Sequence, residues 1–449
     1  MLLSRVITKL VGWAVAVFYD VERTGPPLVD GAVLVTANHP NALVDPLVIF
    51  RTGQRPSRPL AKASLFDQAL TGTLLRGLGG LPVYRRQDDP ALMHLNERTL
   101  DAAVSALQAG EAVQIYPEGR SHSEPSLTPI RTGAARIALR AAAERDWTLD
   151  VHVQPVGLTY TRKHLFRGRV VAAFGEPFSI SELQPLYDED DRAAVRELTD
   201  RIRRGLESLT LNFDHPDDRE LVEVAERLYA RQKKLVRWRE RDLMANRLPR
   251  LRAFASGVRW LRATDPERLT ELRQAVRRYL RLLTLLGASE GDVPPTYRFG
   301  IVLRYSIRQL FMLTLVLPVA VLGVAVWALP YGLTRHVAPR FRPKLDQVAT
   351  YKLGMTILAF PLWWGLTLLA AWFQWGLGPA ALVAAALPAA GLAAIAWRER
   401  QAQVRQDVLV FWRAIKHRGG RDRLLDQRTA LVGAFDELTA AWQVDRGRA

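Results

Sequence analysis

The sequence predicts an α/β domain with a central sheet flanked by helices, followed by a helical region and then by C-terminal membrane helices. Short apolar runs alternate with longer helical patterns over residues 32–175, and such alternation is typical of an α/β layer. A charged helical pattern follows over 182–288, and a very apolar stretch over 309–397 comes after it. The mean hydropathy of -0.03 is therefore an average of three different regimes.

Six short apolar runs have the length and composition of buried strands. They are AVLVTAN (32–38), PLAKASL (59–65), LPVYR (81–85), EAVQIYP (111–117), VHVQPVGL (151–158) and RVVAAFG (169–175). Helical patterns lie between them at 46–51, 66–78, 91–109 and 132–145. Binding groups in an α/β layer gather at strand ends, so we expect the functional residues there.

The first 19 residues predict an amphipathic helix that lies in a membrane interface. Apolar residues recur at helical spacing from Leu2 to Val17, and Arg5 and Lys9 lie on the opposite side. The apolar run 10–19 resembles the core of a signal peptide, but it leads into acidic sequence without a small-residue cleavage site. We therefore expect the mature protein to keep this helix.

The charged region is predicted to be helical, with breaks at Asn212–His215, Pro249 and Asp265–Pro266. Arginine and lysine cluster at 231–241 and 248–281. A solvated helical face and a specific docking surface explain these clusters equally well.

Three apolar stretches, 309–333, 353–375 and 379–397, each have the roughly 20 residues needed to cross a bilayer. Basic residues flank the second and third stretches, and the turn between them, 376–379, carries no charge. The positive-inside rule therefore predicts a hairpin with a short non-cytoplasmic turn. The first stretch has basic flanks on both sides and contains two prolines, so we favour a re-entrant or interfacial element over a simple span.

The formal charge of +17 calls for an anionic partner. Nucleic acid would satisfy it, but the apolar C-terminal stretches favour anionic lipid headgroups together with a phosphorylated substrate. We therefore expect membrane lipids and no nucleic acid, and no pattern indicates an oligomeric state. The chain has no cysteine, which excludes disulfides, thiolate metal sites and cysteine nucleophiles.

The segment NHPNALVDP, residues 38–46, follows a strand pattern and carries a histidine and an aspartate. A carboxylate that holds one imidazole nitrogen makes the other a good general base for an alcohol, which predicts a His39–Asp45 dyad. Helical spacing would not bring these residues to one face, so a turn must precede a helix that begins at Pro46. Asp45 is equally suited to cap that helix, with His39 a bystander. These residues alone fit both interpretations.

The segment YPEGRS, residues 116–121, closes another strand pattern. Pro117 ends the strand and Gly119 permits a sharp turn, so Glu118 and Arg120 project from a strand end. A plain turn would not need a glutamate and an arginine beside the glycine, which favours a functional site. His122 does not have recognised metal-ligand spacing to His39 and Asp45, so we predict no metal site.

Four ordered blocks resemble those of the glycerolphosphate and lysophosphatidic acid acyltransferase superfamily. They are Asn38-His39 with Asp45, GLPVYR (80–85), YPEGRS (116–121) and VQPV (153–156). The resemblance covers about residues 20–210. Five residues separate His39 from Asp45 where the family usually has four, a form similar to the branch of eukaryotic glycerol-3-phosphate/dihydroxyacetone-phosphate acyltransferases.

The resemblance implies transfer of a fatty acyl group from acyl-CoA or acyl-carrier protein to glycerol-3-phosphate, dihydroxyacetone phosphate or 1-acylglycerol-3-phosphate. His39 would be the base that Asp45 orients, and no cofactor is implied beyond the thioester donor. The substrate-binding residues would be Arg85 and Arg120 at the phosphate, Lys62 beside it, and Glu118, Gly119 and Ser121 around the acceptor. The alternatives are an acyltransferase for another lysolipid and a non-catalytic basic membrane adaptor.

These patterns together predict five regions: an interfacial helix (1–19), the acyltransferase domain (20–210), a basic helical region (211–300), a membrane region (301–400) and a cytoplasmic helical tail (401–449). We expect an integral protein whose acyltransferase domain faces the cytoplasm, at the inner membrane if the source is bacterial.

Overall fold

The computed structural model describes residues 12–84, 90–124, 126–233, 242–285, 299–341, 347–416 and 418–446. Contacts divide the chain into two compact units. The sheet unit comprises the described residues up to 212 together with 243–248 and 335–357. The helical unit comprises the remaining described residues.

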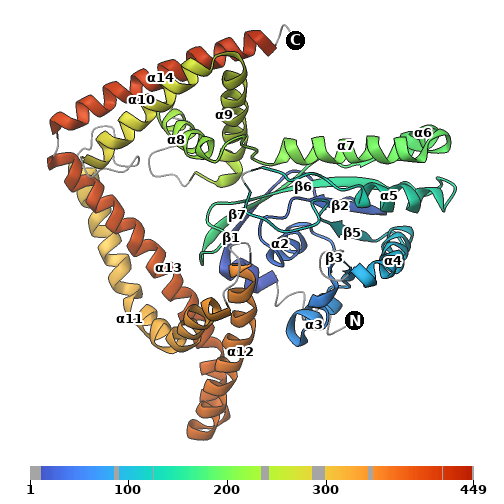
Figure 1. Cartoon of the computed structure of the whole chain (residues 1–449). Coiled ribbons are helices and arrows are strands. Elements are labelled where there is room, and N and C mark those ends of the chain that lie inside the picture. The colour runs from blue at the N-terminus through green and yellow to red at the C-terminus, as the bar shows by residue number, and fades with distance from the viewer. Residues whose placement is uncertain are drawn as a thin grey trace. The chain divides into compact units, whose positions relative to one another are not determined.

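The sheet unit is built on a mixed sheet of eight strands among the described residues (Figure 1). They are β1 (Tyr19–Thr24), β2 (Val33–Ala37), β3 (Ser57–Lys62), β4 (Leu81–Val83), β5 (Ala112–Ile115), β6 (His152–Tyr160), β7 (Gly168–Phe174) and β8 (Phe178–Ser179). Their order is β1-β7-β6-β2-β5-β3-β4, with β8 paired to β6. All six predicted strands are present, while β1 and β8 were not predicted.

Five neighbouring strands, β6, β2, β5, β3 and β4, run parallel. β7 is antiparallel to β6, and β1 is parallel to β7. The carboxyl ends of the five parallel strands therefore meet at one edge of the sheet. Because both predicted motifs follow strands of this set, β2 and β5, the sheet places them side by side.

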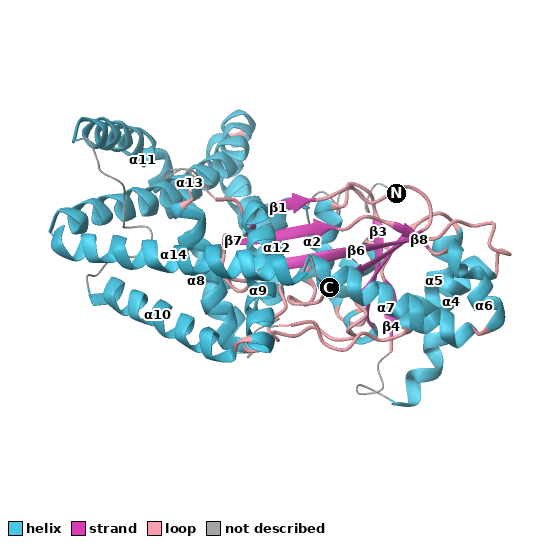
Figure 2. Cartoon of the chain, turned by 90° about the horizontal axis from the view of Figure 1, so that it is seen from above, coloured by secondary structure: helices cyan, strands magenta, loops and turns pink. Residues whose placement is uncertain are grey.

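Apolar side chains fill both faces of the sheet, as the alternation of side chains along a strand requires. Val33 and Val35 of β2 pack with α2 (Val44–Thr52), whereas Leu34 packs on the other face with α4 (Asn96–Gln108), α5 (Gly133–Ala143) and α7 (Asp191–Leu209) (Figure 2). The shorter elements of this unit are α3 (Ala69–Gly77), α6 (Gln184–Glu189) and the 3₁₀ turns Ala63–Leu65, Pro90–Leu95, Ser181–Leu183 and Ala338–Phe341.

The N-terminal segment and the start of α12 (Val348–Trp375) belong to the same core as α2. Residues 12–18 are helical, with Val15 and Phe18 buried in the core that also contains Ala349 and Leu353. The remainder of the predicted interfacial helix, residues 1–11, lies outside the described residues. Where it is described, this segment is therefore part of the sheet unit's packing.

The charged region forms α8 (Pro216–Gln232), α9 (Met244–Thr264) and α10 (Pro266–Leu285). The predicted breaks at 212–215 and 265–266 are confirmed, but the break at Pro249 is wrong, because Pro249 lies inside α9. Pro249 is near the start of that helix, so its missing N–H removes only one backbone hydrogen bond close to the helix N-terminus. The apolar region continues as α11 (Phe299–Val337), α12 and α13 (Leu377–Lys416), and α14 (Arg418–Arg446) ends the described chain.

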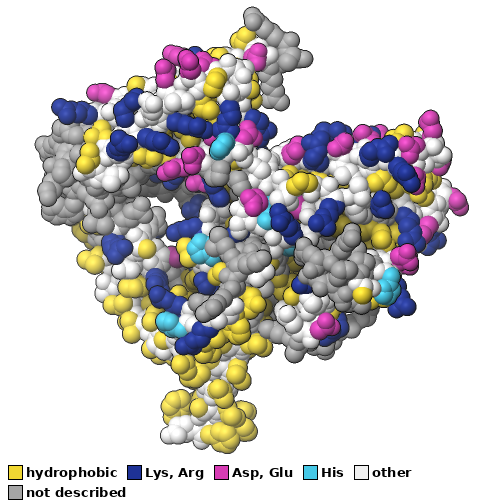
Figure 3. All heavy atoms as spheres, viewed as in Figure 1, with side chains coloured by type: hydrophobic (Ala, Val, Ile, Leu, Met, Phe, Trp, Pro, Cys, Tyr) yellow, Lys and Arg dark blue, Asp and Glu magenta, His cyan; other side chains and the backbone are white. Residues whose placement is uncertain are grey.

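Within the described residues, three helical segments are long and apolar enough to cross a membrane: 303–337, 348–375 and 377–405. Their apolar side chains are largely exposed, and Figure 3 shows hydrophobic side chains covering this part of the molecule. Indole N–H groups link neighbouring helices: Trp327 donates to the Leu387 carbonyl (2.9 Å), Trp363 to Val326 (2.8 Å) and Trp397 to Leu313 (2.9 Å). These helices pack on one another with apolar residues left outside.

Candidate active site

His39 and Asp45 form the predicted pair at the end of β2. The His39 Nδ1 lies 2.8 Å from Asp45 Oδ2, and the Asp45 side chain is fully buried. A backbone turn makes the contact possible: the Val44 N–H donates to the Asn41 carbonyl (3.0 Å), and Ala42 has a φ of 43°. The predicted contact and the predicted turn are therefore both present, and the catalytic role of the pair stays a prediction.

The alternative role of Asp45 as a helix N-cap is wrong. The helix α2 begins at Val44, two residues earlier than predicted, and its N-cap is Leu43, which makes no side-chain cap. The Asp45 carboxylate instead turns back from the first turn of α2. Its Oδ2 also accepts from the Asn41 N–H (2.7 Å), and its Oδ1 accepts from the Tyr160 hydroxyl (2.8 Å). Three donors hold this carboxylate in place, where a cap would use one or two bonds.

The contacts of His39 define its tautomer. A proton on Nδ1 satisfies the Asp45 carboxylate, which leaves the Nε2 lone pair available. Within the described part of the chain, Nε2 has no hydrogen-bond partner. The ring stacks on Tyr116, with centroids 4.1 Å apart, and 12% of the side chain is exposed. Asp45 therefore orients the imidazole through Nδ1 and Tyr116 packs on one face of the ring. The Nε2 atom can then act as a base toward an alcohol.

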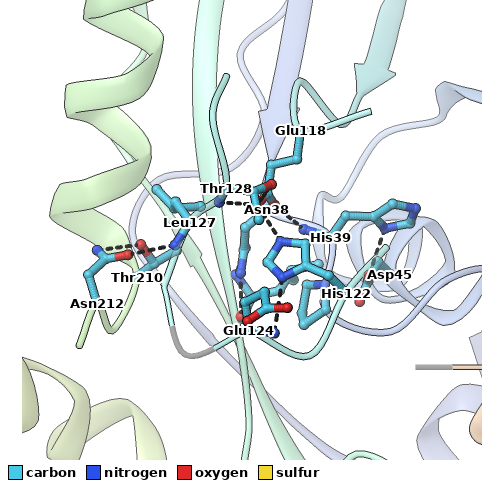
Figure 4. Close-up of polar contacts among 12 residues, drawn as sticks. Asn38, His39, Asp45, Glu118, His122, Glu124, Leu127, Thr128, Thr210 and Asn212 are labelled. Carbon is cyan, nitrogen blue, oxygen red and sulfur yellow. Dashed lines mark hydrogen bonds and ion pairs between the residues drawn. The ribbon is translucent and has the colours of Figure 1, made fainter. Parts of the chain in front are cut away.

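Glu118 connects the two motifs through its carboxylate (Figure 4). Its Oε1 accepts from the His39 N–H (2.9 Å), and its Oε2 accepts from the Thr128 N–H (2.8 Å), the Thr128 hydroxyl (2.9 Å) and the His122 Nε2. Burial alone would raise the pKa of Glu118, but the bonds from His122, Thr128 and His39 outweigh it and lower that pKa. Both oxygens are occupied by the protein, so Glu118 fixes the position of the His39 backbone.

His122 belongs to the same network. Its Nδ1 accepts from the Glu124 N–H (3.2 Å), so the proton lies on Nε2 and is donated to Glu118. The His122 N–H donates to the His39 carbonyl (3.1 Å). Across the described residues no group of three or more His, Asp or Glu side chains could hold a metal ion.

The glycine turn after Glu118 is confined by a neighbouring arginine. Gly119 has a φ of +73°, and a Cβ there would lie 2.9 Å from Nε of Arg131. The guanidinium of Arg131 lies against this turn. Arg120 is exposed and Ser121 is half-buried. The turn therefore presents two cationic side chains near the carboxyl end of β5.

Lys62 is the last residue of β3, and its register partner on β4 is Val83. It therefore lies at the same sheet edge as His39, one strand beyond β5. Arg85 follows β4 by two positions and lies outside the described residues. The strand order thus brings the end of β4 to the edge where Lys62 ends.

Three further residues that contact the candidate site are not predicted from the sequence. Tyr160, at the end of β6, is buried behind Asp45, and its pKa is raised well above the usual value by burial and by the Asp45 charge. Lys163, in the next loop, donates to the Pro40 carbonyl (2.7 Å). Thr128 holds Glu118 through two bonds. Tyr160 and Lys163 lie shortly after the end of the predicted strand 151–158, so a position near a strand end is the one clue that the sequence offers for them.

In comparisons with known proteins, residues 20–159 match the family model described as Acyltransferase. Glycerol-3-phosphate O-acyltransferases 2 and 1 of Saccharomyces cerevisiae are 37% and 36% identical over 135 and 129 residues, which are 30% and 28% of this chain. The match spans only 18% and 17% of those relatives' own length.

A bacterial relative matches over a longer segment. The lyso-ornithine lipid O-acyltransferase of Brucella abortus is 24% identical over 245 residues, 47% of this chain and 83% of that protein. Among solved structures, the 1-acyl-sn-glycerophosphate acyltransferase of Thermotoga maritima aligns with a TM-score of 0.33 and 22% identity, over 46% of this chain and 79% of that one.

Proposed function

We propose that this chain, whose residues 20–159 form an acyltransferase domain of the glycerol-3-phosphate and lysophospholipid type, moves a fatty acyl group from a thioester to a glycerol-phosphate-type hydroxyl. The donor would be acyl-CoA or acyl-carrier protein. The observation that carries the proposal is the contact of the partly exposed His39 with the buried Asp45, with Nε2 directed away from the carboxylate.

The proposed mechanism is general-base catalysis without a covalent acyl-enzyme. As the acceptor oxygen attacks the thioester carbonyl, His39 Nε2 takes its proton, and the Asp45 carboxylate stabilises the imidazolium. The tetrahedral intermediate then expels the thiolate, which takes the proton back from His39. The protons balance, and the reaction needs no cofactor beyond its two substrates.

The acceptor phosphate would bind among the cations at the same sheet edge. We propose Arg85 as its principal ligand, because a guanidinium presents several donors in one plane. Lys62 ends the strand next to the one that leads to Arg85, and Arg120 is exposed on the glycine turn. Glu118, Gly119 and Ser121 would shape the acceptor side, with Glu118 acting through the His39 backbone.

We propose that the chain is an integral membrane protein whose acyltransferase domain lies on the cytoplasmic face, at the inner membrane in a bacterium. The hairpin of α12 and α13 would have its Gly376 turn on the far side.

The path of α11 follows from its contact with α13. Trp327 of α11 contacts Leu387 of α13, and Leu387 lies about 16 Å from Gly376 along the helix axis, at 1.5 Å per residue. A straight α11 would continue past Trp327 and end near the Gly376 turn. Val348, the first residue of α12, lies about 41 Å from that turn along the helix axis. The ten residues between the helices reach at most about 36 Å, which supports an α11 that returns toward the cytoplasmic side.

A lysolipid acceptor without a phosphate monoester is the second candidate. The Brucella abortus relative favours it, because that protein is named for a lyso-ornithine lipid and aligns over most of its length. The two candidates differ in the cation they require: only a phosphorylated acceptor would depend on Arg85.

One experiment tests both candidates. The full chain in detergent is supplied with acyl-CoA or acyl-carrier-protein donors and with glycerol-3-phosphate, dihydroxyacetone phosphate, 1-acylglycerol-3-phosphate or a lyso-ornithine lipid. We expect a phosphorylated acceptor to be used, its KM to rise in Arg85→Ala, and transfer to be lost in His39→Ala. Transfer that is undiminished in His39→Ala would refute the mechanism, and a protein inactive on every acceptor would favour the adaptor.

A further inference from the structure

The loop between β6 and β7, residues 161–167, contacts both turns of the candidate site through Lys163. The Lys163 ammonium donates to the Pro40 carbonyl (2.7 Å), the Ser123 hydroxyl (2.7 Å) and the His122 carbonyl (3.4 Å). Pro40 directly follows His39, and the other two partners follow Glu118. One side chain from a third segment therefore joins the two motifs.

We propose that Lys163 is a positioning residue for His39 and that Lys352 of α12 holds the Lys163 loop in its working place. This inference rests on the proposed function, because it assigns a role in the reaction that His39 would catalyse. Lys163 is not assigned a contact with substrate, since its three ammonium donors are matched by three protein acceptors.

The His39 turn needs an external support. Within the turn, the Val44 N–H bonds the Asn41 carbonyl and the Asp45 N–H bonds the Ala42 carbonyl, so neither local bond reaches Pro40. Ala42 has a φ of 43°, in the left-handed region that disfavours residues with a side chain. Such a backbone conformation persists only where surrounding contacts stabilise it, and the hydrogen bond from Lys163 to the Pro40 carbonyl is one of these contacts.

The Lys163 loop is itself tied to the N-terminal segment and to α12. The Tyr19 hydroxyl donates to the Lys163 carbonyl, and the Arg167 N–H donates to the Phe18 carbonyl (2.6 Å). The Lys352 ammonium donates to the carbonyl of His164 (3.0 Å). Lys352 lies in the first part of α12, next to Leu353, which is buried in the sheet unit's core. A helix apolar enough to cross a membrane is thus bonded to the residue after Lys163.

These contacts form a continuous path from α12 to the base. Lys352 fixes the loop at His164, Lys163 fixes the turn at Pro40, and the turn sets the distance from His39 to Asp45. Releasing either lysine would let the imidazole leave its reactive position for part of the time. Such a loss lowers the turnover of bound substrate and leaves the binding of both substrates nearly unchanged.

The first test compares Lys163→Met with Arg162→Met in the full chain in detergent. Arg162 precedes Lys163 in the same loop, is exposed, and carries the same charge, so it is a matched control. We expect Lys163→Met to lower kcat by about 10- to 100-fold with both KM values within about 3-fold of the parent, and Arg162→Met to keep the parent kcat. Lys163→Arg, which keeps donors toward both turns, should recover part of the loss. Equal kcat in the two Met variants would overturn the proposal.

The second test addresses α12 and does not depend on Lys163→Met folding well. We expect Lys352→Met to lower kcat several-fold at unchanged KM, and the double variant with Lys163→Met to be no slower than Lys163→Met alone, since both break one path. Multiplying effects would overturn the link to α12. His39→Ala is run beside them: if it stays active the proposed mechanism fails, whereas an inactive His39→Ala with a fully active Lys163→Met overturns only the positioning role.

Discussion

Replacing Asp45 by asparagine removes the charge behind the proposed base, His39, with little change in shape. The asparagine amide has one orientation that suits its neighbours: its oxygen accepts from the Asn41 N–H and from His39 Nδ1, and its NH₂ group faces the Tyr160 hydroxyl, which can turn to accept. The tautomer of His39 is then preserved. In the proposed mechanism, the substitution removes the attraction between the carboxylate and the imidazolium that forms as the acceptor is deprotonated.

The magnitude follows from the geometry. The Nδ1 and Oδ2 atoms are 2.8 Å apart. The centres of the two charges are then about 4 Å apart, and an effective dielectric constant near 20 gives about 4 kcal/mol. At about 1.4 kcal/mol per decade, this corresponds to a fall in kcat of roughly 10³-fold.

The assay follows thiol release from acyl-CoA with a saturating acceptor, for the parent and Asp45→Asn, after thermal unfolding has shown equal folding. We expect kcat to fall by about three decades while the KM values stay close to those of the parent. A kcat within 10-fold of the parent would refute the role given to the carboxylate. Loss of folding would instead show that Asp45 matters chiefly to the turn.

Three further outcomes are expected. Hydrogen bonds lower the pKa of Glu118 from 4.5, so its ionised form stabilises the fold above pH 4.5 and this stabilisation is lost as the pH falls below that value. Glu118→Gln should therefore lower the free energy of unfolding by about 1–3 kcal/mol at pH 7. Denaturant titrations of the variant should also show a weaker dependence of stability on acid pH. Gly119→Ala should destabilise the fold by about 1–2 kcal/mol through its φ of +73°, measured by thermal unfolding, whereas Gly133→Ala, with open space around it, should not. Since the chain has no native cysteine, a membrane-impermeant maleimide should label Gly378→Cys from outside intact cells and leave Arg340→Cys unlabelled; the reverse pattern would contradict the proposed topology.

The strands and motifs of the acyltransferase domain could be predicted because each depends on local sequence. A buried strand of a parallel sheet is a continuous apolar run, and both motifs end such runs. The strands β1 and β8 were not predicted. Tyr19–Thr24 is an edge strand that contains three charged residues and so lacks a continuous apolar run, and β8 is only two residues long. The helix propensity of proline predicts a break at Pro249, yet this residue lies within α9, near its start, where the missing N–H removes only one backbone hydrogen bond.

The sequence alone determined that a histidine and an aspartate follow one strand, that a glutamate and a glycine follow another, and that apolar helices end the chain. Only the tertiary structure decided between an N-cap and a dyad for Asp45, because the choice depends on where α2 begins and on the donors that reach the carboxylate. Tyr160 is 115 residues from Asp45, and Lys163 is 123 residues from Pro40. These contacts exist because β6 pairs with β2. The spacing of apolar residues along the chain does not indicate which strands become neighbours in the sheet.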